Sequence, residues 1–95
     1  MTVSYTCRAE RDLLEIGLYT VATWGEAQWE EYAALLEHTC EVILPKNRRF
    51  ARAFPLRAGL FRWKCERHVI FFRKVKSGIE IVRVLHERML PERHL

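Results

Sequence analysis

The fold of this 95-residue chain is decided by residues 60–86, which read LFRWKCERHVIFFRKVKSGIEIVRVLH. Apolar and polar side chains alternate from Leu60 to Cys65, the period of a strand with one buried face. Residues 68–75 are apolar on both faces, as in a central strand. Residues 76–78, Lys-Ser-Gly, predict a hairpin turn into a last strand over 79–86. The stretch therefore predicts a three-stranded antiparallel sheet.

Two helices are predicted before this sheet, over residues 9–24 and 26–44, with Gly25 between them. Glycine is favoured after a last helical turn, and Pro45 is expected to end the second helix. Apolar residues follow one another at steps of three and four along the second helix: Trp29, Tyr32, Ala33, Leu36, Cys40 and Ile43. Alternation over residues 2–8 predicts a short N-terminal strand. Residues 46–58 are predicted to be a loop, with at most one helical turn. The fold class is therefore α+β, in a single domain spanning residues 1–95.

Composition excludes several classes of protein. Half of the residues are hydrophobic (49%), so a core can form, and no run of eighteen apolar residues could span a membrane. Residues 1–11 are polar and lack the apolar core of a secretory signal, which predicts a cytoplasmic location. The three cysteines are expected to be reduced thiols, since none shows C-x-x-C spacing. No histidine pair has metal-ligand spacing, so neither a metal nor another cofactor is expected.

The helical hairpin can cover only one face of the sheet. Alternation predicts that the second face carries the apolar side chains of Ile70, Phe72, Val82 and Val84. A contiguous exposed apolar surface is typical of an interaction site, so a partner is expected there. The alternative is that residues 46–58, with Phe50 and Phe54, fold across that face and cover it.

Charge is distributed unequally along the chain. Residues 1–45 carry two basic and eight acidic residues, and residues 46–95 carry fourteen basic and four acidic ones. The resulting +10 of the second part favours a polyanion or an acidic protein as a partner. An acidic helical layer packed against a basic sheet layer would also explain this unequal distribution of charge. In the loop at 46–58, basic residues alternate with aromatic ones. The loop could bind nucleic acid, or its aromatic side chains could join the core.

Several stretches in this order resemble the ParE toxins of the RelE/ParE superfamily of bacterial type II toxin–antitoxin systems. The resemblance covers nearly the whole length. The matching stretches are Ala9-x-x-Asp12-Leu13-x-x-Ile16, Tyr19, Trp24-Gly25 with Gln28 and Tyr32, Arg57-x-Gly59, Arg67–Arg73 (RHVIFFR), Ile81–His86 (IVRVLH) with Arg88-Met89, and Arg93-His94-Leu95.

This resemblance implies a toxin that is neutralised by a cognate ParD-like antitoxin and that inhibits growth by poisoning DNA gyrase. The antitoxin would contact Trp29 together with the apolar sheet residues Ile70, Phe72, Val82 and Val84. The target would contact the C-terminal part of the chain, through Arg83, His86, Arg88, Met89, Arg93 and His94.

Relatives on the same scaffold cleave ribosome-bound mRNA, so a RelE-type endoribonuclease is the alternative. Such chemistry needs a base, an acid and cations around the scissile phosphate. The three tyrosines all lie in the N-terminal third, at positions 5, 19 and 32, so a C-terminal tyrosine base is missing. His86 could substitute, with Arg62, Arg83 and Arg88 as phosphate partners. The missing tyrosine favours a toxin that is not an enzyme.

Overall fold

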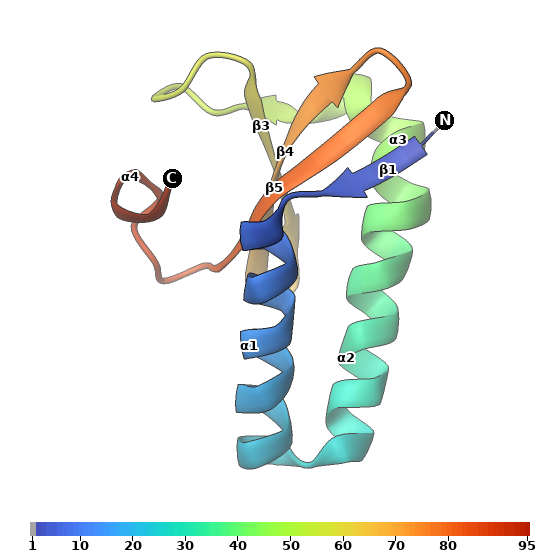
Figure 1. The fold of residues 1–95 in the computed structure, drawn as a ribbon, viewed down its shortest axis with the longest axis vertical. Coiled ribbons are helices and arrows are strands. Elements are labelled where there is room, and N and C mark those ends of the chain that lie inside the picture. Colours follow the sequence, from blue (N-terminus) through green and yellow to red (C-terminus); the bar gives the residue numbers. More distant parts are fainter. Residues whose placement is uncertain (1) are drawn as a thin grey trace.

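The computed structural model describes residues 2–95 (Figure 1). Its elements follow one another as β1 (Thr2–Tyr5), α1 (Cys7–Trp24), α2 (Glu26–His38), the π-helix η1 (Thr39–Ile43), α3 (Leu44–Asn47), the 3₁₀ helix η2 (Arg48–Phe50), β2 (Arg52–Ala53), β3 (Leu60–Cys65), β4 (His68–Val75), β5 (Gly78–His86) and α4 (Pro91–His94). The predicted α+β class and the helix–helix–sheet order are confirmed.

The sheet has five strands rather than three, in the order β1-β5-β4-β3-β2. The three predicted strands form its antiparallel centre. The short strand β1 pairs in parallel with β5, from Thr2 opposite Gly78 to Tyr5 opposite Ile81. Two residues of the predicted loop, Arg52 and Ala53, pair with β3 as the other edge. Both additions are short edge strands, which alternation detects poorly because so few residues are involved.

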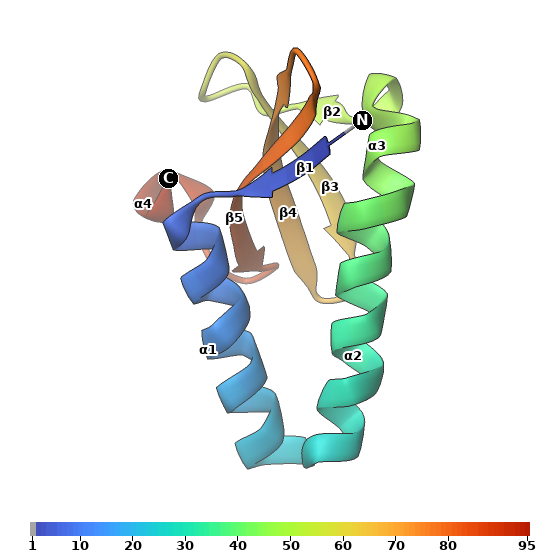
Figure 2. The same cartoon turned by 45° about the vertical axis from the view of Figure 1, so that its right-hand side comes forward.

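The helical hairpin packs against one face of the sheet and extends past its end, as Figures 1 and 2 show. Helix α1 begins two residues earlier than predicted, because the hydroxyl of Thr6 accepts from the N–H of Ala9 at 3.0 Å and caps it. Gly25 between the helices has φ 93°, a conformation that suits glycine. Where the helices approach, a Cβ on Gly17 would lie 2.8 Å from the Trp29 ring.

The prediction that Pro45 ends the second helix is wrong. The helical path continues through η1 and α3 to Asn47. The N–H of Leu44 bonds to the carbonyl of Thr39, five residues back, so the turn before the proline is a widened π turn. Such a turn shifts the hydrogen-bond register just where Pro45 has no N–H to donate.

A β-bulge in β5 decides which side chains face the helices. Phe71 is opposite Arg83 and Phe72 is opposite Ile81, so Val82 has no partner of its own. After this extra residue the alternation is reversed. Val84 therefore lies on the same face as Ile81, and Leu85 on the other, whereas simple alternation predicted the opposite for both.

The main core lies between the helices and the sheet, and the predicted uncovered face was assigned wrongly. Ile70, Phe72 and Val84 are at most 2% exposed and pack under the helices in the main core. A second, smaller core fills the opposite face with Phe54, Leu60, Phe71 and Leu85, and Leu95 packs against it. Phe54 meets Phe71 edge to face at 5.5 Å, so part of the 46–58 segment does cover this face. Phe50 does not, since it is 70% exposed.

None of the helices in residues 2–95 is long and apolar enough to cross a membrane. Cys7, Cys40 and Cys65 are free thiols, as expected. Burial raises the pKa of the Cys40 thiol to about 12, which keeps it protonated and packed as an apolar side chain.

Candidate functional site

Asp12 of helix α1 occupies the edge of β5 where the pairing with β1 has ended. Its Oδ2 accepts from the backbone N–H of Val84 at 2.9 Å, in the place of a strand carbonyl. The same oxygen accepts from Arg83 Nε at 2.8 Å, and Oδ1 accepts from Nη2 at 3.0 Å. The carboxylate and the guanidinium thus form a bidentate, buried ion pair between helix and sheet.

Arg83 connects this pair to the C-terminal segment, residues 87–95. Its Nη1 donates to the backbone carbonyl of His94, and only 8% of the residue is exposed. The hydrogen bond with Asp12 raises the pKa of Arg83 above its usual value. Arg83 was predicted to contact the target. It lies beneath the surface instead, and it holds in place the segment that carries the other predicted target residues.

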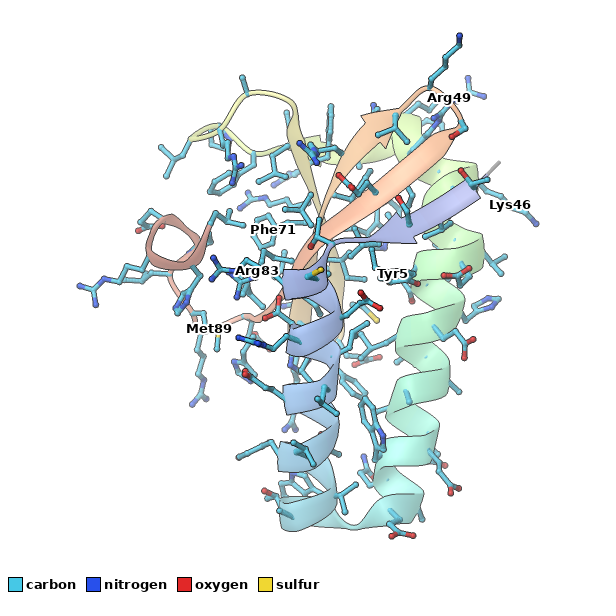
Figure 3. All side chains as sticks on the ribbon, in the orientation of Figure 1. Tyr5, Lys46, Arg49, Phe71, Arg83 and Met89 are labelled. Carbon is cyan, nitrogen blue, oxygen red and sulfur yellow. The ribbon has the colours of Figure 1, made fainter. Side chains whose placement is uncertain are left out.

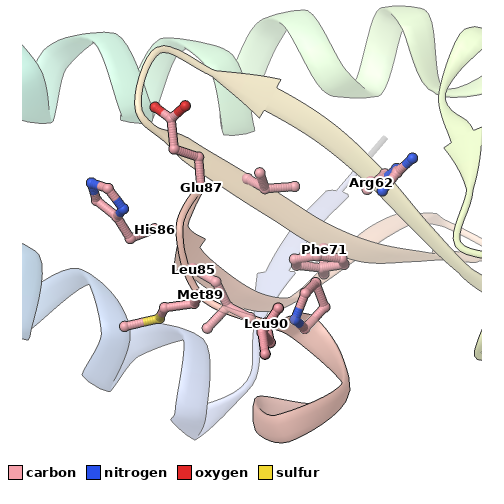
Figure 4. Close-up of a pocket in the computed structure, with 9 residues that line it drawn as sticks. Arg62, Phe71, Leu85, His86, Glu87, Met89 and Leu90 are labelled. Carbon is pink, nitrogen blue, oxygen red and sulfur yellow. The ribbon is translucent and has the colours of Figure 1, made fainter.

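The C-terminal segment borders a shallow pocket of about 270 Å³ on the second face of the sheet (Figure 4). Phe71, Leu85 and Leu90 lie in the middle of this site, with His86 to one side and Arg62 to the other. The pocket is lined by Arg62, Val69, Phe71, Leu85, His86, Glu87, Met89, Leu90 and Pro91. An apolar floor with a charged rim is typical of a protein-binding surface.

A cluster of Tyr32, His68 and His86 stands where α2 meets the ends of β4 and β5. The Tyr32 hydroxyl and His68 Nδ1 are 2.7 Å apart, and the two imidazole rings meet edge to face at 5.3 Å. His86 Nδ1 accepts from the backbone N–H of Arg88 at 3.1 Å, at the start of the C-terminal segment. Burial, and then the neighbouring His86, lowers the pKa of His68 to about 4. His68 is therefore neutral at physiological pH.

The predicted target residues lie together around the C-terminal segment, with different exposures. Arg88, Arg93 and Met89 are exposed, and His86 and His94 are partly buried. Arg83 is poorly placed to contact a phosphate, because it is only 8% exposed and its Nε, Nη1 and Nη2 all donate within the protein. These contacts favour a structural role for Arg83 over the catalytic one of the ribonuclease alternative.

A second pocket, of about 230 Å³, opens between the two helices. It is lined by Tyr5, Leu13, Trp29, Ala33, Leu36 and Glu37. Five of these six side chains are apolar or aromatic, and the Tyr5 hydroxyl donates to Glu41 nearby. We call this pocket the hairpin groove.

The predicted antitoxin residues are separated by the structure. Trp29 lines the hairpin groove, whereas Ile70, Phe72 and Val84 are buried beneath the helices and cannot touch a partner. Val82 is partly buried and belongs to the opposite face, beside Phe71 and Leu85. The prediction failed because alternation separates two faces without showing which of them the helices cover.

Asp12 is the functional residue that sequence reasoning misjudged. An acid near the start of a helix suggests a partner for the helix dipole, but only Glu10 lies in the first turn of α1. The signal was present: Asp12 follows Ala9 by three residues and precedes Ile16 by four, on the face that packs against the sheet. A lone acid on such a face needs a buried cation.

Within residues 2–95, no group of three or more His, Cys, Asp or Glu side chains is placed to hold a metal ion.

Comparison with known proteins gives consistent matches. Residues 3–91 match the family described as "ParE toxin of type II toxin-antitoxin system, parDE". The chain is 39% identical over 88 residues to Toxin ParE1 of Caulobacter vibrioides, covering 93% of this chain and 91% of that protein. It is 36% identical over 89 residues to Toxin ParE1 of Mycobacterium tuberculosis, covering 92% and 90%. A solved structure titled "Chromosomal ParDE TA system from P. aeruginosa" superposes with a TM-score of 0.72 at 18% identity, over 90% of this chain and 95% of that one, and so shares the fold.

Proposed function

This chain belongs to the ParE toxin family of type II toxin–antitoxin systems, and from that premise we propose that it arrests bacterial growth by binding DNA gyrase through its C-terminal segment. The observation that carries the proposal is the anchoring of this segment. Arg83 donates from Nη1 to the backbone carbonyl of His94 and from Nε to the carboxylate of Asp12, so it connects the segment to helix α1. The segment is thereby fixed on the protein while Arg88, Met89 and Arg93 remain exposed.

Fixed exposed cations beside apolar side chains suit a protein target. Such a segment has little ordering entropy left to lose on binding, and Met89 and Leu90, at 43% and 50% exposed, offer apolar contact. The neighbouring pocket could accept an apolar side chain of the target between Phe71 and Leu90.

A supercoiling assay with purified gyrase tests the target. The full chain is expected to inhibit supercoiling at micromolar concentration, and a chain truncated after His86 is expected to lose inhibition. Arg88→Ala with Arg93→Ala should weaken inhibition while leaving the thermal transition unchanged, because both side chains are exposed. Full supercoiling at micromolar toxin would refute gyrase as the target.

The ribonuclease alternative makes opposite predictions. A nuclease would cleave mRNA in intoxicated cells and would lose this cleavage in His86→Ala, since His86 is the base that could substitute for the missing tyrosine. Intact mRNA is expected for the gyrase proposal, with the wild type and with His86→Ala alike.

The hairpin groove is the surface at which a ParD-like antitoxin would bind. Its apolar lining around Trp29 and Leu36 suits the apolar face of an amphipathic helix. Ala33 lines the groove, and the next residue, Ala34, is exposed on the same helix. Ala33→Arg should therefore weaken antitoxin binding at least tenfold, whereas Ala34→Arg, its matched control, should not. Equal affinities of the two variants would place the antitoxin elsewhere.

A further inference from the structure

The end of the molecule at the β4–β5 turn carries cations that are left without acidic partners. Residues 46–57 contain five Lys or Arg and residues 73–78 contain three, and neither range contains Asp or Glu. Among residues 2–95, one of these eight cations forms a salt bridge, Arg73 with Glu80. In the part of the chain that the structure describes, the acidic helices form no salt bridge with the other seven cations. Within residues 2–95, the one ion pair that joins a helix to the sheet is Asp12–Arg83.

Cations from both ranges meet at this end. Arg48 of η2 donates from Nη1 to the carbonyl of Gly78, the first residue of β5 after the β4–β5 turn, at 3.0 Å. This bond ties the segment after α3 to the turn that carries Lys76. Lys46 and Arg49 project from the same end in Figure 3, away from the C-terminal segment. We call the basic end the set Lys46, Arg48, Arg49, Lys74 and Lys76.

An exposed aromatic ring lies among these cations. Phe50 is 70% exposed, and the Arg49 guanidinium carbon lies 5.7 Å from its ring centroid. Phe50 packs in neither core cluster, although Phe54 and Phe61 nearby do. A large apolar ring kept in solvent between cations has no structural role in the sheet. It is suited to stack with a nucleobase while the cations contact phosphates.

We propose that the basic end is a binding site for single-stranded nucleic acid. Lys46, Arg49 and Lys76 contact consecutive phosphates, and Phe50 stacks with a base. The short site and its single exposed ring favour an unpaired strand, because the bases of a duplex are stacked on one another and shielded from side-chain rings. This inference is independent of the gyrase proposal, since it concerns a surface away from the C-terminal segment (Figures 1 and 3).

The test is fluorescence anisotropy of the purified full chain with labelled oligo(dT), oligo(U) and a duplex of equal length, at several salt concentrations. The variant Lys46→Glu/Arg49→Glu/Lys76→Glu removes three phosphate contacts. The matched control Arg8→Glu/Arg11→Glu/Arg67→Glu has the same net charge and also changes only exposed side chains. Circular dichroism verifies that both variants are folded.

The basic-end variant is expected to lose more than tenfold in affinity for the single strands, and its slope of log K against log salt should fall by about 2. The control should keep at least a third of the wild-type affinity. Phe50→Ala should cost about tenfold on single strands and leave the weaker duplex binding unchanged. Comparison of oligo(dT) with oligo(U) shows whether DNA or RNA is preferred. Equal losses in the two triple variants, tighter binding to the duplex, or no effect of Phe50→Ala would each overturn the proposal.

Discussion

Replacement of Asp12 by alanine should destabilise the protein more than any surface substitution. The carboxylate accepts three hydrogen bonds, two from the Arg83 guanidinium and one from the Val84 N–H. In Asp12→Ala these donors lose their acceptor in a place where Arg83 is 8% exposed and Val84 is 2% exposed. No side-chain nitrogen or oxygen that is buried in residues 2–95 lacks a hydrogen-bond partner at present, so the defect would be a new one.

The magnitude follows from two costs. Removal of one partner of a buried ion pair costs about 3–5 kcal/mol, and an unsatisfied backbone N–H costs about 1–3 kcal/mol. Arg83 retains its bond to the carbonyl of His94, which offsets part of the first cost. We expect about 4 kcal/mol for Asp12→Ala, a large share of the roughly 5–15 kcal/mol that stabilises a domain of this kind.

The measurement is urea denaturation of Asp12→Ala, Arg83→Met and the double variant. The double variant removes both charges and should be less destabilised than the sum of the single variants by about 2 kcal/mol or more, because no buried charge is then left alone. Tryptic cleavage after Arg88 and Arg93 should also be faster in Asp12→Ala, since the C-terminal segment is held through Arg83. Additive single effects, or a cost of Asp12→Ala below about 1 kcal/mol, would refute the reasoning.

The remaining predictions concern packing and protonation. Gly17→Ala should destabilise by about 1–3 kcal/mol in urea denaturation despite the helix propensity of alanine, because the new Cβ would lie 2.8 Å from the Trp29 ring; a gain in stability would contradict this close approach. Phe54→Ala should cost about 3 kcal/mol, since Phe54 is 7% exposed, and Phe50→Ala, its control at 70%, should cost less than about 0.5 kcal/mol; equal unfolding midpoints would contradict the covering of the second face. The pKa of His68 is lowered to about 4 in the folded state, so its contribution to stability is complete above pH 6.5 and is lost as the pH falls toward 4. A loss of roughly 1–2 kcal/mol over this range should be reduced in His68→Gln, and identical pH profiles for the two proteins would contradict it.

Much of the fold could be predicted because its signals are local. The period of two from Leu60 to His86 defined the three central strands, and the helical period with Gly25 defined the hairpin. Local signals could not show that β1 pairs with β5, because that pairing joins residues more than seventy positions apart. They also could not show the bulge at Val82, which depends on how β5 fits β4 and not on its own composition.

The candidate site was predictable only in outline. The predicted residues from His86 to His94 do lie together, because the segment after β5 is short and must remain near the end of that strand. The burial of Arg83 was not predictable from its own neighbours in the sequence. It depends on Asp12, 71 residues away, and a strand pattern gives no information on partners from another element.

The order of the strands has a consequence for synthesis on the ribosome. β5 is the last strand to be translated, yet it lies in the sheet between β4 and β1, the first strand to be translated. A nascent chain that ends before Gly78 therefore has no neighbour for β1, no partner for Asp12 and no Leu85 to complete the second core. The sheet therefore cannot be completed until β5 has been translated, and products that end before Gly78 lack the anchored C-terminal segment altogether.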